Sequence, residues 1–368
     1  MDFRLKLRDV FWQKVLCPFL FGKEAEEAHL FTIETLKDMQ QLKMLWILRL
    51  LYRSPLHRMP TQVLGTIWHN PVGLAAGFDK HAEVIPALEA LGFGAVEIGT
   101  VTPRPQSGNE KPRLFRNPAM FAVLNRYGFN SHGSEIVARR LYNLHEHPFG
   151  KVQIPIGISI GKNKDTPDTD AVKDYLRAYS DFCGVLRPQD WVKINISSPN
   201  TPNLRDIFGR LDDFLAEFVE GTRRMPIRMW PPVNGKTHFP GRFVLKIPPD
   251  DLTQKDLERV VELCAKHHFA GIEATNTTVD EKIKEKCGWA GQMGGVSGEP
   301  LRMLANQKLF EMKDAAKAKG VDLIGVGGIS RGHHATQKRE ENAKVVQCYT
   351  GLVFRGPSLI HEILDHWK

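Results

Sequence analysis

From residue 70 onward, eight short apolar runs recur, and most of them end in glycine, serine, threonine or asparagine. Amphipathic helical patterns fill most of the gaps between the runs. Near-continuous apolar strands that alternate with helices are typical of a parallel sheet that is covered on both faces. Eight such units predict an α/β fold, a (β/α)8 TIM barrel. The runs lie at residues 71–77, 94–101, 154–161, 191–198, 242–249, 270–277, 322–328 and 343–351.

A doubly wound open sheet is the alternative arrangement of the same units. No GxGxxG motif follows the first run, however, as a dinucleotide-binding fold would require. Ahead of these units, the stretch AEEAHLFTIETLKDM has apolar residues near helical spacing. We therefore expect a small N-terminal helical extension at residues 1–55 and a catalytic barrel domain at residues 60–368. Short amphipathic helices in this place can cap a core or lie on a membrane surface.

Two connections are longer than ordinary barrel loops. Residues 102–133 separate the second apolar run from the next helical pattern, and long structured excursions inside compact domains are usually functional. The stretch NRYGFN within this excursion is either a glycine turn between aromatic residues or a loop folded over a ligand at the barrel mouth. Residues 225–242 are rich in proline, glycine and aromatic residues, and we expect them to form a surface protrusion.

The composition narrows the classes of partner. The net charge of +8 is compatible with an anionic ligand and equally with a solvated basic surface. No run of five basic residues and no nucleic-acid-binding motif occurs, so we expect no nucleic-acid partner. The five cysteines form no CxxC pair, which predicts reduced thiols and no zinc site. No secretory signal is visible, and no uncharged apolar stretch reaches the roughly 18 residues of a membrane span.

The residues that end the apolar runs predict the active site, because parallel barrels carry it at the carboxyl ends of their strands. These ends are rich in amides, hydroxyls and lysines and poor in carboxylates, and no His/Asp/Glu cluster has metal-ligand spacing. Such a metal-free set suits a planar, polar, anionic ring. The glycines of GVGG and YTG, after the seventh and eighth runs, predict a phosphate site. Lys246 interrupts an apolar run and needs an anionic partner, which a reduced flavin would supply.

Eight motifs in order resemble one family. NPVGLAAGFDKH, VEIGTVTPRPQSGN, NRYGFNSHG, GKNK, NISSPNT, ATNTT, GGVSGEPLR and IGVGGI are together similar to dihydroorotate dehydrogenase, class 2. The resemblance implies a barrel with an N-terminal helical pair and FMN as the cofactor. It implies oxidation of dihydroorotate to orotate in pyrimidine (UMP) biosynthesis, with ubiquinone as the electron acceptor. It also implies a membrane surface as partner and, as in eukaryotic members, the mitochondrial inner membrane as location.

The resemblance carries over to individual residues. It implies Ser198 as the catalytic base that takes a proton from ring C5 while hydride passes from C6 to the flavin. The expected substrate contacts are Lys80, Asn125, Arg126, Tyr127, Gly128, Phe129, Asn195, Asn200, Asn276 and Thr277. The expected FMN contacts are Ala75, Ala76, Gly77, Thr100, Ser159, Asn195, Lys246, Thr275, Gly298, Gly327, Gly328, Tyr349 and Thr350. The expected quinone site consists of His29, Arg116 and Tyr349.

Two of the chain's departures from the family pattern concern the flavin contact and the N-terminus. Ser159 stands where many members have an asparagine before GKN, so the flavin contact there becomes a shorter hydroxyl. The family's leader and membrane helix are missing, which we interpret as an N-terminal truncation. The alternatives are a class 1-like dihydroorotate dehydrogenase that uses a soluble acceptor and a catalytically silent protein on a membrane surface. Class 1 enzymes carry a cysteine where this chain has Ser198, so the serine favours class 2.

Overall fold

Eight parallel strands close into a barrel in the order β10-β12-β13-β3-β4-β7-β8-β9, which confirms the predicted fold. The computed structural model describes residues 8–52, 58–146, 152–201, 204–225 and 242–367. The barrel strands are β3 Val72–Leu74, β4 Ala95–Val101, β7 Ile156–Ile160, β8 Trp191–Asn195, β9 Arg242–Ile247, β10 Gly271–Ala274, β12 Asp322–Val326 and β13 Ala343–Cys348. The expected protrusion at residues 225–242 lies almost entirely outside the described residues.

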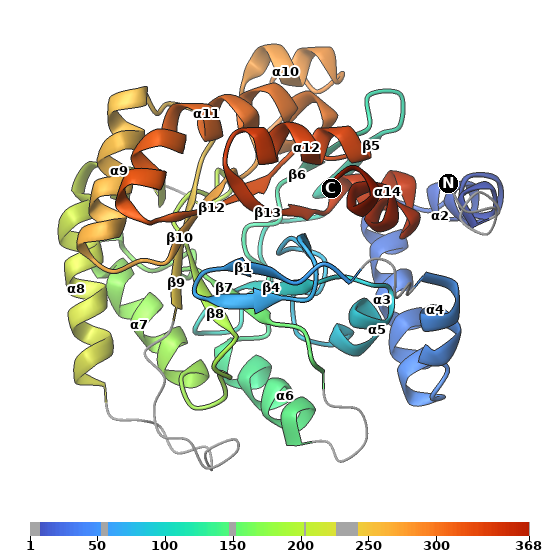
Figure 1. Cartoon of the computed structure of the whole chain (residues 1–368), viewed down its shortest axis with the longest axis horizontal. Helices are drawn as coiled ribbons and strands as arrows, with labels where there is room; N and C mark the ends of the chain where they lie inside the picture. Colours follow the sequence, from blue (N-terminus) through green and yellow to red (C-terminus); the bar gives the residue numbers. More distant parts are fainter. Residues whose placement is uncertain (1–7, 53–57, 147–151, 202–203, 226–241, 368) are drawn as a thin grey trace.

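Helices cover the outside of the barrel, as Figure 1 shows. Every residue of β7 and β8 is buried, because these strands contact side chains both inside the barrel and under the helices. Helix α9 illustrates the helical layer: a capping box at Thr253 opens it, and its buried residues include Leu257, Val260, Val261 and Cys264. The outer helices are α5 Ile85–Ala90, α6 Ser134–Glu146, α7 Ala171–Phe182, α8 Leu211–Arg224, α9 Gln254–Lys266, α11 Arg302–Lys319, α12 Gly332–Glu340, α13 Thr350–Arg355 and α14 Ser358–His366.

A hairpin closes the amino end of the barrel. It consists of β1 Thr61–Val63 and β2 Thr66–Trp68, joined at Leu64 and Gly65. Both joining residues have positive φ, 55° and 65°, as a two-residue turn of type I′ requires. Trp68 stacks on Trp191 of β8 with ring centroids 5.1 Å apart, so large side chains fill the barrel at this end.

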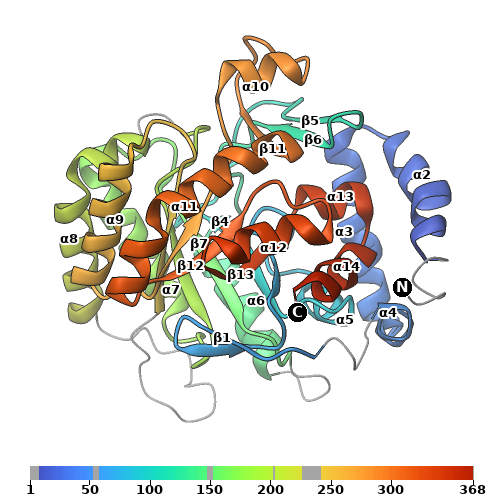
Figure 2. The same ribbon diagram turned by 45° about the horizontal axis from the view of Figure 1, so that its top comes forward.

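The carboxyl end carries the long excursion as a small antiparallel sheet. β5 Leu114–Asn117 and β6 Ala122–Asn125 form its hairpin, and β11 Gly295–Gly298 pairs with β6. Figure 2 shows this sheet and α10 Glu281–Lys286 on the side of the molecule opposite β1. Three short 3₁₀ turns complete the described loops, at Asp168–Asp170, Leu204–Arg210 and Glu299–Leu301.

The N-terminal helices lie against one side of the barrel, beside α5 and α14 (Figures 1 and 2). Ile33, Leu36 and Leu48 belong to the same buried core as the barrel strands and their helices. Within the described residues, no helix combines the length and the apolar character needed to cross a membrane. The segment comprises a π-helical turn at Trp12–Leu16, then α2 Cys17–Phe21, α3 Ala25–Gln41 and α4 Leu45–Tyr52.

Candidate active site

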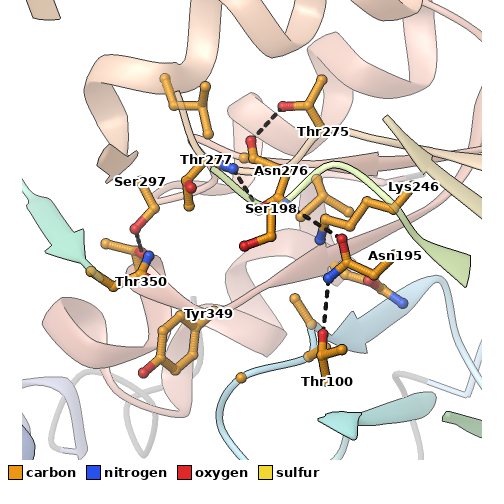
Figure 3. Close-up of a pocket in the computed structure, with 18 of the residues that line it drawn as sticks. Thr100, Asn195, Ser198, Lys246, Thr275, Asn276, Thr277, Ser297, Tyr349 and Thr350 are labelled. Carbon is orange, nitrogen blue, oxygen red and sulfur yellow. Dashed lines mark hydrogen bonds between the residues drawn. The ribbon is translucent and has the colours of Figure 1, made fainter. Parts of the chain in front are cut away.

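A pocket opens at the carboxyl ends of the barrel strands, and Figure 3 shows the side chains around it. It combines the strand ends of the barrel with the small sheet of the excursion, so residues distant in sequence meet there. Most of the residues predicted to bind substrate or flavin line it: Ala75, Ala76, Gly77, Lys80, Thr100, Asn125, Tyr127, Gly128, Phe129, Asn195, Ser198, Asn200, Lys246, Thr275, Asn276, Thr277, Gly298, Gly327, Gly328, Tyr349 and Thr350.

Ser198 lies on the turn after β8 and is 5% exposed. Its Oγ accepts a hydrogen bond from the backbone N–H of Asn200 at 3.3 Å. Among the described lining residues there is no histidine and no carboxylate, so Ser198 has no side-chain base beside it in the pocket. Ser197 is fully buried instead: its Oγ bonds Asn195 Oδ1 and accepts from Asn276 Nδ2 at 3.0 Å. The two serines therefore differ in accessibility, and only Ser198 faces the pocket.

The asparagines hold one another in fixed orientations. Asn195 donates from Nδ2 to Thr100 Oγ1 at 2.9 Å, and its Oδ1 accepts from Asn276 Nδ2 at 3.3 Å (Figure 3). Asn200 Nδ2 lies 3.2 Å from Asn125 Oδ1, which joins the turn after β8 to the small sheet. Amides that are held in this way present fixed donors and acceptors to a ligand and lose little side-chain entropy on binding.

Lys80 stands at the wall of the pocket, below the excursion. Its Nζ lies 3.4 Å from the centroid of the Tyr127 ring and donates to Asn130 Oδ1. Burial and the nearby Arg113 guanidinium lower the pKa of Lys80 to about 7, although Glu26 partly offsets them. An anionic ligand would restore the charge of this ammonium group.

Three members of a layer of four charged side chains inside the barrel, Glu97, Lys193 and Glu273, were not predicted from the sequence. Glu97, Lys193, Lys246 and Glu273 come from four different strands, and all are at most 7% exposed. Lys246, which was predicted, lines the pocket. Lys193, Gln347 and Ser297 also line it and were not predicted. A signal for the layer existed, because a single charged residue interrupts each of the runs AVEIGTV, WVKIN and GIEA. Lys246 was expected to meet an anion, and its partner within the chain is Glu273.

A second, largely apolar pocket lies between the N-terminal helices and the barrel. All three residues of the predicted quinone site line it. The His29 ring is 5.5 Å from the Phe78 ring, and Arg116 donates to the Leu20 carbonyl at 3.2 Å. Tyr349 lines both pockets. Burial, reinforced by Lys80, lowers the pKa of His29 to about 4, so this imidazole is neutral at physiological pH.

Two predicted residues do not line either pocket. The Arg126 guanidinium donates to the Pro112 carbonyl, at 2.8 Å from Nη2, and lies over the Phe115 ring on the excursion. Ser159 is fully buried, and its Oγ lies 2.8 Å from Thr100 Oγ1. The short Ser159 side chain contacts Thr100 and does not reach the pocket, so it can act there only by orienting Thr100.

Among the described residues, no group of three or more His, Cys, Asp or Glu side chains could hold a metal ion.

Comparison with known proteins agrees with this geometry. The family model for dihydroorotate dehydrogenase matches residues 58–368. The chain belongs to the dihydroorotate dehydrogenase family. A protein named dihydroorotate dehydrogenase (quinone) from Yersinia pseudotuberculosis is 38% identical over 349 residues, which is 94% of this chain and 97% of that relative. A protein of the same name from Yersinia pestis matches at 38% identity over the same 94% and 97%.

Solved structures of family members show the same fold. A DHODH from Eimeria tenella in complex with ferulenol has a TM-score of 0.80 and 28% identity, and the match covers 95% of this chain and 93% of that one. The ligand-free form has a TM-score of 0.76 and 30% identity, with 91% of this chain and 93% of that chain covered. The resemblance read from the eight motifs is thereby confirmed, and the quinone-linked names of the curated relatives do not favour the class 1-like alternative.

Proposed function

We propose that this chain oxidises dihydroorotate to orotate in pyrimidine biosynthesis and passes the electrons to a quinone. The observation that carries the proposal is the pocket at the strand ends, where interlocked asparagines, Lys80 and Ser198 surround one space. Family membership and the relatives named dihydroorotate dehydrogenase (quinone) support the same reaction. Class 2 chemistry is favoured over the class 1-like alternative because a serine, not a cysteine, faces the pocket.

The pocket residues fit FMN, which we propose as the cofactor. Two buried polar atoms of the lining, Thr277 Oγ1 and Gln347 Oε1, have no hydrogen-bond partner among the described residues. Gly327 and Gly328 line the pocket with φ of 98° and 77°, and Arg302 leaves no room for a side chain on Gly328, so glycine is required in this turn, which we propose as the phosphate site. When bound, FMN supplies the acceptor for the hydride. Lys246, Gln347, Thr100 and the glycine turns would hold it.

The residues of this chain have separate tasks in the proposed reaction. Ser198 Oγ takes the proton from the substrate ring as its own hydroxyl proton passes to water, and the backbone N–H of Asn200, which donates to this oxygen, stabilises the negative charge that the loss of the hydroxyl proton leaves on it. Asn125, Asn195 and Asn276 hold the amide edges of the ring. Lys80 compensates the charge of the substrate carboxylate. Because the asparagines are fixed before the ligand arrives, the ring is oriented without further ordering of the site.

The purified protein should be yellow, and its flavin absorbance should bleach when dihydroorotate is added without oxygen. Bleaching is expected because the pocket offers a base, a carboxylate partner and a flavin site together. Anaerobic absorbance spectroscopy is the measurement. A flavin that dithionite reduces but dihydroorotate leaves oxidised would contradict the proposed substrate, and a protein that binds no flavin would contradict the proposed reaction as a whole.

Orotate should bind more weakly as the pH rises above 7. The lowered pKa of Lys80, about 7, means that the ligand-free site loses this positive charge above that pH, while the carboxylate of orotate stays ionised. Binding must then restore the proton, so the dissociation constant should rise with pH and level off below 7. Titration of the flavin spectrum between pH 6 and 9 measures it. Lys80→Met should bind weakly with little pH dependence over that range.

We further propose that the second pocket receives the quinone. The second pocket is largely apolar, and Tyr349 lines both this pocket and the proposed flavin site. Because one side chain borders both spaces, electrons would have a short path from flavin to quinone. Ala28→Phe should fill part of the pocket, so that the phenyl ring and the quinone compete for the same space. Forcing extra atoms into a filled space costs about 1–3 kcal/mol, so kcat/KM for quinone should fall about tenfold or more. Anaerobic reduction by dihydroorotate should be unchanged.

The matched control for this variant lies on the same helix. Leu30→Phe adds the same side chain at a position that is 49% exposed and outside the pocket. Stopped-flow reduction and steady-state quinone assays separate the two half-reactions. Equal losses of quinone reduction in both variants, or a loss of both half-reactions in Ala28→Phe, would contradict a quinone site at this place.

The N-terminal helices are proposed as the membrane-facing part of the protein. Residues 1–55 would form the quinone region and residues 60–368 the catalytic barrel. Phe11, Phe19, Trp46 and Leu50 are at least half exposed, which fits an apolar face that lies on a lipid surface. A mitochondrial inner membrane location remains our prediction from the family resemblance, while the curated relatives named above are bacterial.

A further inference from the structure

Four charged side chains form a linear chain of contacts under the active-site pocket, and Gln347 Nε2 donates to Glu97 Oε2 at one end of it at 3.4 Å. Lys193 Nζ contacts Glu97 Oε1 directly and lies 2.9 Å from Glu273 Oε2. Lys246 Nζ contacts the other oxygen, Glu273 Oε1. Glu273 thus bridges the two lysines, and Lys193 bridges the two glutamates. The chain of contacts runs Glu97–Lys193–Glu273–Lys246.

The order of charges is fixed by the barrel. Lys246 pairs in register with Asn195 of β8 on one side and with Glu273 of β10 on the other. Both lysines line the pocket, whereas both glutamates lie outside its lining. The side chains of Lys193 and Glu273 have no exposed surface, so water does not screen the contacts between them. The lysines therefore present positive charge to the pocket, and the glutamates place negative charge on the side of the lysines away from it.

The two lysines are not equivalent. Burial lowers the pKa of Lys246, and Glu273 offsets this only in part. Burial acts on Lys193 in the same direction, but Glu273 and Glu97 outweigh it and raise the pKa of Lys193. The two glutamates thus favour the charged form of Lys193, which contacts Glu97 Oε1 and Glu273 Oε2. Without it, both carboxylates would be left to Lys246 alone.

We propose that Lys193 is a positioning residue for Lys246: by occupying Glu97 and one oxygen of Glu273, it leaves the Lys246 ammonium group free to stabilise negative charge on a ligand in the pocket. This inference rests on the proposed function, because that ligand is the flavin, which gains negative charge on reduction. With all four groups ionised, the layer is neutral. Replacing one lysine by a neutral residue therefore makes the net charge of the layer −1, and replacing one glutamate makes it +1.

The midpoint potential of the bound flavin tests the proposal through these signs. Lys193→Met leaves an excess negative charge and should weaken binding of reduced flavin relative to oxidised flavin at least tenfold, which is a fall of about 30 mV for a two-electron couple. Glu273→Gln leaves an excess positive charge and should raise the potential. The double variant Lys193→Met/Glu273→Gln restores neutrality and should return the potential close to the wild-type value. Dye-equilibrated reductive titration of the holoprotein measures all three.

The control is a buried carboxylate at the opposite end of the same strand. Asp190 immediately precedes β8, is 2% exposed and pairs with Arg187 at 2.8 Å. Asp190→Asn should lower stability and leave the potential unchanged. Shifts of Lys193→Met and Glu273→Gln in the same direction, or no shift in either, would overturn the proposal.

The outcomes also separate this inference from the proposed function. If Lys193→Met does not fold, Glu273→Gln decides alone, because it keeps the shape of the side chain and must raise the potential. An unchanged or lowered potential in that variant overturns the proposal, while wild-type bleaching by dihydroorotate would leave the proposed function intact. A wild-type protein that binds no flavin would contradict both the inference about Lys193 and the proposed function.

Discussion

Replacing Ser198 by alanine should slow the anaerobic reduction of the flavin by dihydroorotate about 10²-fold or more, the lower part of the range for a general base. The effect should fall on the reductive step, because Ser198 faces the pocket while its neighbour Ser197 is buried among the asparagines. Stopped-flow absorbance at the flavin band measures this step directly. Flavin binding and quinone reduction by chemically reduced enzyme should be unaffected.

A conservative variant provides the control for this prediction. Ser198→Cys should keep part of the rate, since a thiol can accept and donate a proton at the same place. The alanine variant loses the hydrogen bond from the Asn200 backbone N–H, but both variants keep the side-chain contacts of Asn195, Asn200 and Asn276, so orotate affinity should change little in either. A wild-type rate in Ser198→Ala would remove Ser198 from the role of base.

Arg113→Met should lower the free energy of unfolding by about 3 kcal/mol, the lower end of the cost of breaking a buried ion pair, because Lys111 Nζ still lies 3.6 Å from Glu26 Oε1. Arg113 joins the excursion to helix α3: Nη2 lies 2.8 Å from Glu26 Oε1, and Nη1 donates to the carbonyls of Ser107 and Asn109. Both side chains of the ion pair are less than 10% exposed. Chemical denaturation of the holoprotein, followed by circular dichroism, measures the change.

A surface ion pair gives the comparison. Arg139 and Glu135 lie one turn apart on α6, 3.3 Å from each other, and about 60% of each side chain is exposed. Arg139→Met should cost about 0–1 kcal/mol, as exposed pairs usually do. If the two arginine variants unfold at the same denaturant concentration, the Glu26–Arg113 pair does not fasten the N-terminal helix to the excursion.

The barrel could be predicted because its signal is local. Each strand is a short apolar run whose neighbours along the chain are helices, and the closed eight-stranded order follows from the repetition. The site followed from the barrel, since the carboxyl ends of parallel strands meet at one face. Asn195, Ser198 and Asn276 were predicted in this way and line the pocket, and the family motifs added the excursion residues.

The charged layer could not be predicted in the same way. Glu97, Lys193 and Glu273 are far apart in sequence, and only barrel closure brings them into contact. One charge in an apolar run indicates a buried partner but does not say which residue it is. Arg126 and Ser159 lie outside the pocket lining for a related reason: the direction and reach of a side chain depend on neighbours such as Pro112 and Thr100, which no motif encodes.

The hairpin of β1 and β2 has a consequence for assembly. Because Trp68 and Trp191 stack inside the amino end of the barrel, we expect ligands to enter the described interior from the carboxyl end. With FMN on the charged layer and dihydroorotate between it and the excursion, as proposed, we expect the cofactor to load first and the substrate second. Substrate then blocks the way out, so a working enzyme should lose flavin more slowly than an idle one.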